Sequence, residues 1–138
     1  MNTTSRILGE AKRKVRPPTK VRPPTEEELT NPLNAYEYAV DVIEGRWLEG
    51  EATIATSPYW AQHYAEDVIR GRFPEGEAAI ATVPAPAYYY ARDIIGGRFP
   101  EGEAAIAKDP PYAELYLKAF PVSKLEWAMN GWLDWLDL

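Results

Sequence analysis

The sequence predicts an all-α fold, and more specifically a short α-solenoid of tandem 26-residue helical hairpins. Three consecutive blocks of 26 residues align without a gap and are identical at fourteen positions. Within each block, small and apolar residues recur with the period of an α-helix. A unit of this length cannot bury its apolar face alone, so we expect neighbouring units to stack on one another.

The blocks define three complete units and the start of a fourth. They are residues 32–57 (PLNAYEYAVDVIEGRWLEGEATIATS), 58–83 (PYWAQHYAEDVIRGRFPEGEAAIATV) and 84–109 (PAPAYYYARDIIGGRFPEGEAAIAKD). A fourth unit opens at Pro110 with PPYAELYLKAF and then departs from the pattern. We number these segments units 1 to 4, and count positions within a unit from its first proline.

The first half of each unit is predicted to be a helix with one buried face. In unit 2 that face comprises Ala61, Tyr64, Ala65, Val68 and Ile69. Polar residues that fit a helix N-cap precede the first proline of three units; these are Asn31, Ser57 and Asp109. Val83 precedes unit 3 and lacks a capping side chain. The glycines after the last apolar residue predict a left-handed stop; these are Gly45, Gly71 and Gly97.

The second half of each unit is predicted to be a shorter helix. Pro74 and Pro100 fit its first position, and acidic residues follow in the first turn, where the helix dipole favours them. In unit 2 its buried side is predicted to be Phe73, Ala78, Ile80 and Ala81. A glycine recurs inside this helix, as Gly50, Gly76 and Gly102 in units 1 to 3. Its recurrence predicts that two backbones approach closely at a packing contact.

Residues 1–31 are predicted to be an extended, basic, proline-rich arm before the repeats at 32–120. The hexapeptide KVRPPT occurs twice in succession, at 14–19 and 20–25, and paired prolines favour polyproline II. Glu26–Leu29 could add a helical turn. Residues 1–25 carry seven Lys/Arg and one acid, whereas the remaining 113 residues carry eight Lys/Arg and 20 acids. The basic side chains assigned to the arm are Arg13, Lys14, Arg16, Lys20 and Arg22.

Residues 121–138 are predicted to be a tryptophan-rich helix that caps the last hairpin. Ser123 and Glu126 match a capping box. One helical face is predicted to hold Leu125, Ala128, Trp132, Trp135 and Leu136. The acidic, aromatic end has a second interpretation, in which it docks in the groove of a partner protein.

Composition excludes several classes of protein. The chain has no cysteine, so disulfides and thiolate metal sites are excluded and a reducing cytoplasm is compatible with it. No apolar run approaches the ~20 residues of a membrane span, and the N-terminus does not resemble a secretory signal. We therefore expect a cytoplasmic protein without a cofactor, a metal site or a membrane partner.

The motif YAxDVIxGRFPEGEAAI, at 64–80 and, with Ile94 in place of the Val, at 90–106, resembles a short helical repeat of tailed bacteriophages and related mobile elements. The resemblance covers residues 32 to about 120, and not the basic arm or the tryptophan-rich end. It implies a viral protein that acts on host or virion proteins, and it implies no catalytic activity.

Two recurrent sets of charged residues have structural explanations. Asp41, Asp67 and Asp93 recur with Arg46, Arg72 and Arg98, and we expect each aspartate to pair with an arginine of its own or the neighbouring unit. The alternative is a row of ion pairs that meets a ligand. Glu49, Glu75, Glu101 and Glu51, Glu77, Glu103 could bind divalent cations, but solvated helix starts commonly carry such residues.

The variable positions of the first helices are the candidate protein-binding site. They carry aromatic side chains that differ between units, and aromatic residues are enriched at binding hot spots. The candidates are Tyr36, Tyr59, Trp60, His63, Tyr88, Tyr89 and Tyr112, with Trp60 and Tyr88 expected to be the exposed anchors. The alternative is that some fill the groove between neighbouring hairpins. His63 has no visible catalytic partner, so no catalytic residue is predicted.

The sequence therefore predicts a non-catalytic protein-interaction module whose partner is another protein. One alternative is an inhibitor whose acidic body mimics nucleic acid and occupies a host protein. Another is a virion or assembly component that uses its basic arm. Nucleic acid is expected to bind only through that arm, because the rest of the chain would repel phosphates.

Overall fold

The computed structural model describes residues 21–121 and 123–133, and this part of the chain contains helices and no strand. The prediction of an all-α protein is confirmed. The elements are α1 (Glu26–Thr30), α2 (Pro32–Tyr38), η3 (Ala39–Ile43), α3 (Leu48–Ile54), α4 (Pro58–Tyr64), η4 (Ala65–Ile69), α5 (Pro74–Ile80), α6 (Pro84–Tyr89), η5 (Tyr90–Ile95), α7 (Pro100–Ala107), α8 (Pro110–Ala119) and α9 (Ser123–Met129).

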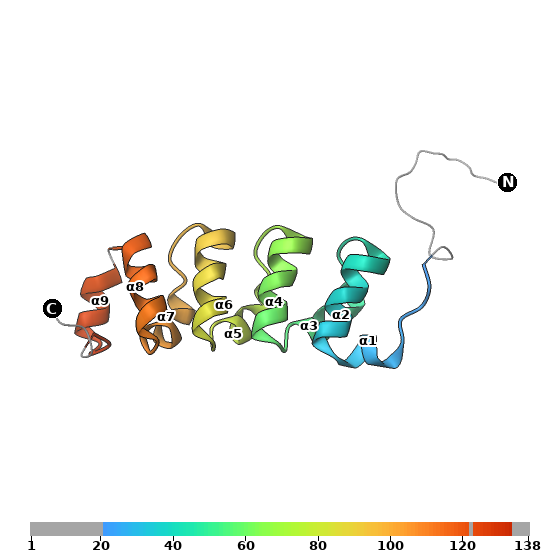
Figure 1. Ribbon diagram of the computed structural model, residues 1–138, viewed down its shortest axis with the longest axis horizontal. Coiled ribbons are helices and arrows are strands. Elements are labelled where there is room, and N and C mark those ends of the chain that lie inside the picture. Colours follow the sequence, from blue (N-terminus) through green and yellow to red (C-terminus); the bar gives the residue numbers. More distant parts are fainter. Residues whose placement is uncertain (1–20, 122, 134–138) are drawn as a thin grey trace.

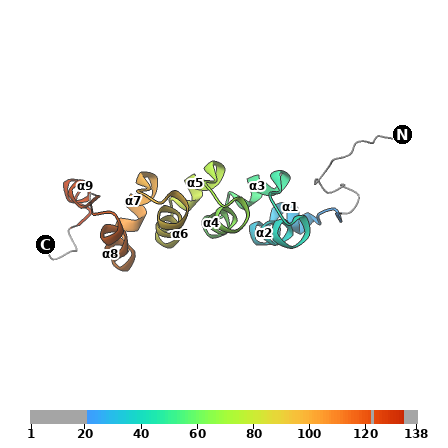
Figure 2. The same cartoon turned by 90° about the horizontal axis from the view of Figure 1, so that it is seen from above.

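Each complete unit forms one long and one short helix. The long helix begins as an α-helix and ends as a π-helix (η3, η4 or η5), and the short helix is α3, α5 or α7. The long helices α2, α4, α6 and α8 stand side by side in a row (Figure 1). Seen from above, the short helices form a second layer along one side of that row (Figure 2). Neighbouring long helices contact one another along the row, and α3 also contacts α5.

The predicted helix starts are confirmed. The side chains of Asn31, Ser57 and Asp109 each accept a hydrogen bond from a backbone N–H three residues later. Val83 precedes α6 without a side-chain cap, as its chemistry requires. Pro74 and Pro100 occupy the first turns of the short helices.

The predicted helix ends are wrong by one residue. The left-handed conformation lies at Glu44, Arg70 and Gly96, not at the glycines that follow them. The cause is the π-helical last turn, in which the N–H groups of residues 70 and 71 both reach back to the carbonyl of Ala65. This wider turn brings the chain to its stop one residue earlier than an α-helix would. Glu44 and Arg70 adopt a backbone that is uncommon for side chains with a Cβ atom.

The buried core repeats with the units. In unit 2 the long helix contributes Ala61, Tyr64 and Ala65, and the short-helix region contributes Phe73 and Ile80, all nearly inaccessible to solvent. Val68 and Ile69 pack against the core but are only partly buried, whereas they were predicted to be buried. The π-helical turn shifts them away from the α-helical stripe. Ala78 is exposed and Ala81 is half-buried, because the buried face of the short helix contains only Gly76 and Ile80.

Two of the three recurrent glycines, Gly76 and Gly102, lie where two helices almost touch, as predicted, whereas a Cβ atom on Gly50 would meet only the Trp47 ring. A Cβ atom on Gly76 would come 2.8 Å from the Cβ of Ala61 and 2.7 Å from the Phe73 ring. Gly102 meets Ala87 and Phe99 in the same way. The absence of a side chain therefore sets the distance between the two helices of a unit.

The segment before unit 1 is not extended throughout. Residues 26–30 form α1, which has a complete capping box between Thr25 and Glu28 and packs against α2. The suggestion that Glu26–Leu29 add a helical turn is therefore confirmed, and the extended arm does not include these residues, because three consecutive glutamates after a capping threonine favour a helix. Of the basic side chains assigned to the arm, Arg22 lies in the described part, whereas Arg13, Lys14, Arg16 and Lys20 lie outside it.

The C-terminal helix packs through a different face from the predicted one. Trp127 is fully buried and stacks on Tyr116, whereas Leu125 is 71% exposed and Ala128 is also exposed. The Ser123 hydroxyl is buried without a hydrogen-bond partner, and the Glu126 carboxylate pairs with Arg98, so the predicted capping box is wrong. Trp132 is half-buried beside Trp127. The predicted positions of Trp135 and Leu136 fall outside the described residues.

Candidate functional site

A hydrogen-bonded cluster joins each short helix to the long helix of the next unit. In unit 2 the Arg72 guanidinium binds the Glu77 carboxylate through Nε (2.8 Å) and Nη2 (3.0 Å). The hydroxyl of Tyr90, from unit 3, donates to the same carboxylate at 2.6 Å and accepts from the backbone N–H of Phe73 at 2.8 Å. We call this cluster the inner junction.

The inner junction occurs with the same geometry three times. The equivalent sets are Arg46, Glu51, Tyr64 and Trp47, and Arg98, Glu103, Tyr116 and Phe99. The recurrent arginines therefore pair with glutamates and not with the recurrent aspartates. The expectation that an aspartate pairs with an arginine of its own unit is met only at Asp93, whose partner is Arg92. The tyrosine reaches the previous unit because it lies on the long-helix face that contacts the preceding short helix.

The inner junction keeps its groups in one protonation state near neutral pH. The hydrogen bonds from Arg72 are the main cause that lowers the pKa of Glu77, and burial is the main cause that raises the pKa of Tyr90. A carboxylate that stays ionised and a phenol that stays protonated do not exchange protons at pH 7. These groups are suited to holding units together.

The acidic ladder does not form a cation site in the described part of the chain. Within residues 21–121 and 123–133, no three His, Cys, Asp or Glu side chains are grouped so that they could hold a metal ion. Glu51, Glu77 and Glu103 instead serve the inner junctions, whereas Glu49, Glu75 and Glu101 are exposed. The arginine partners explain why the two sets of glutamates differ.

A second contact joins neighbouring long helices, and we call it the outer junction. Position 5 of one unit meets position 3 of the next, so that Tyr36 packs on Trp60 with ring centroids 5.1 Å apart. Tyr88 packs on Tyr112 at 5.9 Å. At the middle junction the corresponding residues are Gln62 and Pro86, and both are buried. The outer junction therefore uses different side chains each time.

The candidate aromatic residues gather in two clusters on the long helices. The first contains Tyr36, Trp60 and His63, and the Tyr36 hydroxyl donates to Asp67 at 2.5 Å. Burial is the main cause that raises the pKa of Tyr36, with further contributions from Asp67, Asp41 and Glu66. All three rings are half-buried, so the expectation that Trp60 is an exposed anchor is only partly met.

The second cluster contains Tyr88, Tyr89 and Tyr112, and Arg92 lies over the rings of Tyr88 and Tyr89. Tyr88 is only 4% exposed, so the prediction that it is an exposed anchor is wrong. It packs across the outer junction because position 5 faces the next unit. Tyr89 and Tyr112 are half-buried and leave part of their rings accessible to a partner.

Tyr59 is the most exposed of the candidate residues, at 51%. It lies in the first turn of α4, whereas Tyr89 and Tyr112 pack edge to face across the junction between units 3 and 4, with ring centroids 5.9 Å apart.

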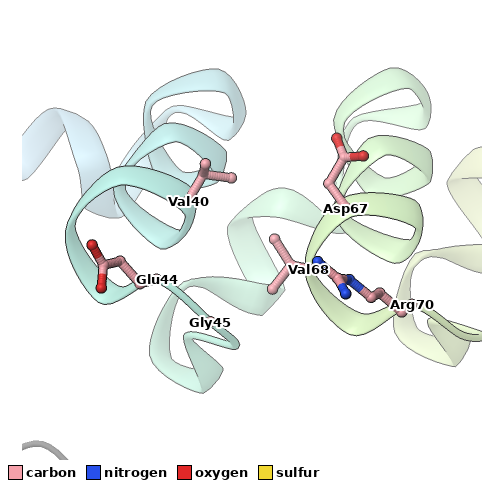
Figure 3. A pocket seen from close by; sticks show the side chains of 6 residues that line it. All are labelled: Val40, Glu44, Gly45, Asp67, Val68 and Arg70. Carbon is pink, nitrogen blue, oxygen red and sulfur yellow. The ribbon is translucent and has the colours of Figure 1, made fainter.

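A cleft opens between the ends of the first two long helices. Its volume is about 490 Å³. Figure 3 shows Val40 on one helix and Val68 on the next pointing into the gap, with Asp67 beside them. The remaining lining residues are Glu44, Gly45 and Arg70. The cleft thus combines apolar walls with charged groups at its rim, and the sequence analysis did not identify it.

Nothing matched this chain in comparisons with protein-family models, with curated proteins and with solved structures. The phage-repeat resemblance therefore stays a prediction. No helix within the described residues is long and apolar enough to cross a membrane.

Proposed function

We propose that this chain is a non-catalytic protein-interaction module, an α-solenoid that binds a partner protein with the variable face of its long helices. One observation carries the proposal: the arginine, glutamate and tyrosine of the inner junctions are the same at all three junctions, whereas the accessible aromatic side chains lie at positions that vary. Repeat proteins that bind partners commonly keep packing residues constant and vary the exposed ones.

The chemistry of this face supports protein recognition. Tyr59, Tyr89 and Tyr112 offer large apolar rings and hydroxyl groups at low cost in side-chain entropy. Arg92 lies over the rings of Tyr88 and Tyr89 and is held there by two hydrogen bonds to Asp93, so it adds a planar polar group and little net charge. Tyrosine and arginine are among the residues most enriched at binding hot spots.

The proposal is tested by affinity capture from a lysate of the source organism, followed by binding measurements with the captured partner. Tyr59→Ala and Tyr89→Ala should each weaken binding by about tenfold or more, which is typical of hot-spot residues. Leu48→Ala is the matched control, because Leu48 is 73% exposed but lies on a short helix. If Leu48→Ala weakens binding as much as the tyrosine variants, the long-helix face is not the binding surface.

A second candidate function is inhibition of a nucleic-acid-binding protein by charge mimicry. The exposed carboxylates of Asp41, Glu66 and Asp67 surround Tyr36 and support it. Mimicry predicts that binding weakens steeply with added salt, because it rests on charge. Binding through the tyrosine face predicts a weak dependence on salt.

A further inference from the structure

The helix at the C-terminal end of the row, α9, is apolar on two opposite faces. Trp127 is fully buried against the row, where it stacks on Tyr116. Leu125 and Met129 lie two residues before and after Trp127, which places them on the opposite face of the helix, and they are 71% and 78% exposed. A helix that is apolar on all sides is usually buried on all sides. The outer face of α9 is therefore a candidate contact surface.

The last long helix, α8, leaves open a face that the next unit contacts on the earlier long helices. In unit 3, Tyr88 at position 5 packs on a ring of unit 4 and is buried. In unit 4, positions 5 and 6 are Glu114 and Leu115, and both are exposed. Together with Pro111 and Lys118 they line a hollow of about 350 Å³. Within the described residues no long helix follows α8, so this outer-junction face is uncovered there.

Both open faces lie at the same end of the row. α9 lies beyond α8 along the long axis of the molecule in both views (Figures 1 and 2). Figure 2 also shows that α9 continues the layer of short helices, whereas α8 ends the row of long helices. A two-fold rotation can therefore bring the projecting α9 of each copy against the α8 of another copy, so that both open faces are covered at once.

The charges of the two faces are complementary between copies. Glu114 lies on the open face of α8, and Lys124 lines a hollow on α9 beside Leu125. Neither side chain forms an ion pair with another described residue. Lys118 lies one helical turn after Glu114, so contact at Glu114 attracts Lys124 whereas contact at Lys118 repels it. The charges thus select one position of α9 along α8.

We propose that two copies of this chain associate through their C-terminal ends, with α9 of each copy packed on α8 of the other. Leu125 and Met129 then cover Leu115 of the other copy, and Lys124 lies beside its Glu114. The arrangement is closed, so association stops at the dimer. Two short helices from each copy form a small interface, and we expect a dissociation constant on the order of 10–100 µM. The dimer does not depend on the proposed binding of a partner protein.

Sedimentation equilibrium of the full-length protein, at about 1 to 500 µM around the expected dissociation constant, tests the proposal and should show a reversible equilibrium between monomer and dimer. Leu125→Glu should weaken dimerisation at least about tenfold, because it places a charge in an apolar contact. Leu48→Glu is the matched control, because Leu48 is similarly exposed but lies on α3 in unit 1, and it should leave the equilibrium unchanged. A monomer at every concentration would overturn the proposal, as would a series of larger oligomers.

Charge reversal tests which residues meet. Glu114→Lys and Lys124→Glu should each weaken dimerisation about tenfold, because each brings like charges together twice in the dimer. An equimolar mixture of these two variants should dimerise about as tightly as the natural chain, since every contact then joins opposite charges. A mixture that stays monomeric would overturn the proposed contact. Circular dichroism establishes that each variant is folded, and Met129→Glu tests the same face if Leu125→Glu is not.

Discussion

The inner and outer junctions join the same units but use side chains in opposite ways. At the inner junction an arginine, a glutamate, a tyrosine and a backbone N–H meet in the same arrangement three times. At the outer junction the pairs are Tyr36 with Trp60 and Tyr88 with Tyr112, whereas the middle junction has Gln62 and Pro86.

The difference follows from burial and directionality. A buried carboxylate needs several donors at fixed positions, so a change in one member leaves the others unpaired. Contacts between half-buried rings are less directional, and many side chains of similar size satisfy them. The inner junction can therefore set the geometry of the row, while the outer junction tolerates different side chains in different units.

The largest expected effect is at the last inner junction. Glu103 accepts hydrogen bonds from Arg98, Tyr116 and the Trp127 indole, and it is 3% exposed. Glu103→Ala should lower the free energy of unfolding by about 3–5 kcal/mol, because the buried Tyr116 hydroxyl and Trp127 indole lose their acceptor and Arg98 keeps only the exposed Glu126 as a partner. Urea denaturation measures this change. Glu101→Ala, an exposed glutamate of the same helix, should cost less than about 1 kcal/mol, and equal losses would contradict the importance of the junction.

A smaller effect is expected where the two helices of one unit touch. Gly76→Ala places a Cβ atom less than 3 Å from both Ala61 and Phe73, and we expect it to destabilise the protein by about 1–3 kcal/mol through overpacking. Gly45→Ala is the control, because a Cβ atom there meets nothing within 4 Å. Thermal unfolding of the two variants should separate them clearly. Similar melting temperatures would show that the short helix moves to make room.

Removal of one hydroxyl group compares the two junctions directly. Tyr90→Phe leaves the buried N–H of Phe73 without its acceptor and should cost about 1–2 kcal/mol. Tyr36→Phe removes a hydrogen bond to an exposed carboxylate and should cost less than about 1 kcal/mol, because water replaces the lost partner. Both changes are measured by chemical denaturation. The reverse order would show that the outer junction is the stronger one.

The protonation of Glu77 is expected to change the free energy of unfolding least, because it has no effect at neutral pH and acts only in acid. Hydrogen bonds from Arg72 lower the pKa of Glu77 in the folded protein. Its contribution to stability is therefore complete above the unfolded pKa of about 4.3, and it is lost as the pH falls through the lower folded pKa. Glu77→Gln should flatten the fall in stability below about pH 4.3.

Much of the local structure follows from the sequence, because caps and close contacts depend on neighbouring residues. Asn31, Ser57 and Asp109 cap helices because their side chains reach an N–H three residues away. Gly76 marks a close contact because no other residue fits there. Tyr64 in unit 2, and its equivalent in the other units, was assigned to the buried face. The groups that its hydroxyl binds were not predicted, because they lie in the preceding unit.

The sequence by itself determined the all-helical class, the 26-residue period and the helix starts, all of which depend on residues a few positions apart. Only the tertiary structure decided that Arg72 binds Glu77 and not Asp67, that Tyr88 is buried, and that Trp127 fills the end of the row. Each of these depends on how far one helix is displaced and rotated against another. That displacement is set by packing across units, where a shift of one residue changes which side chains meet.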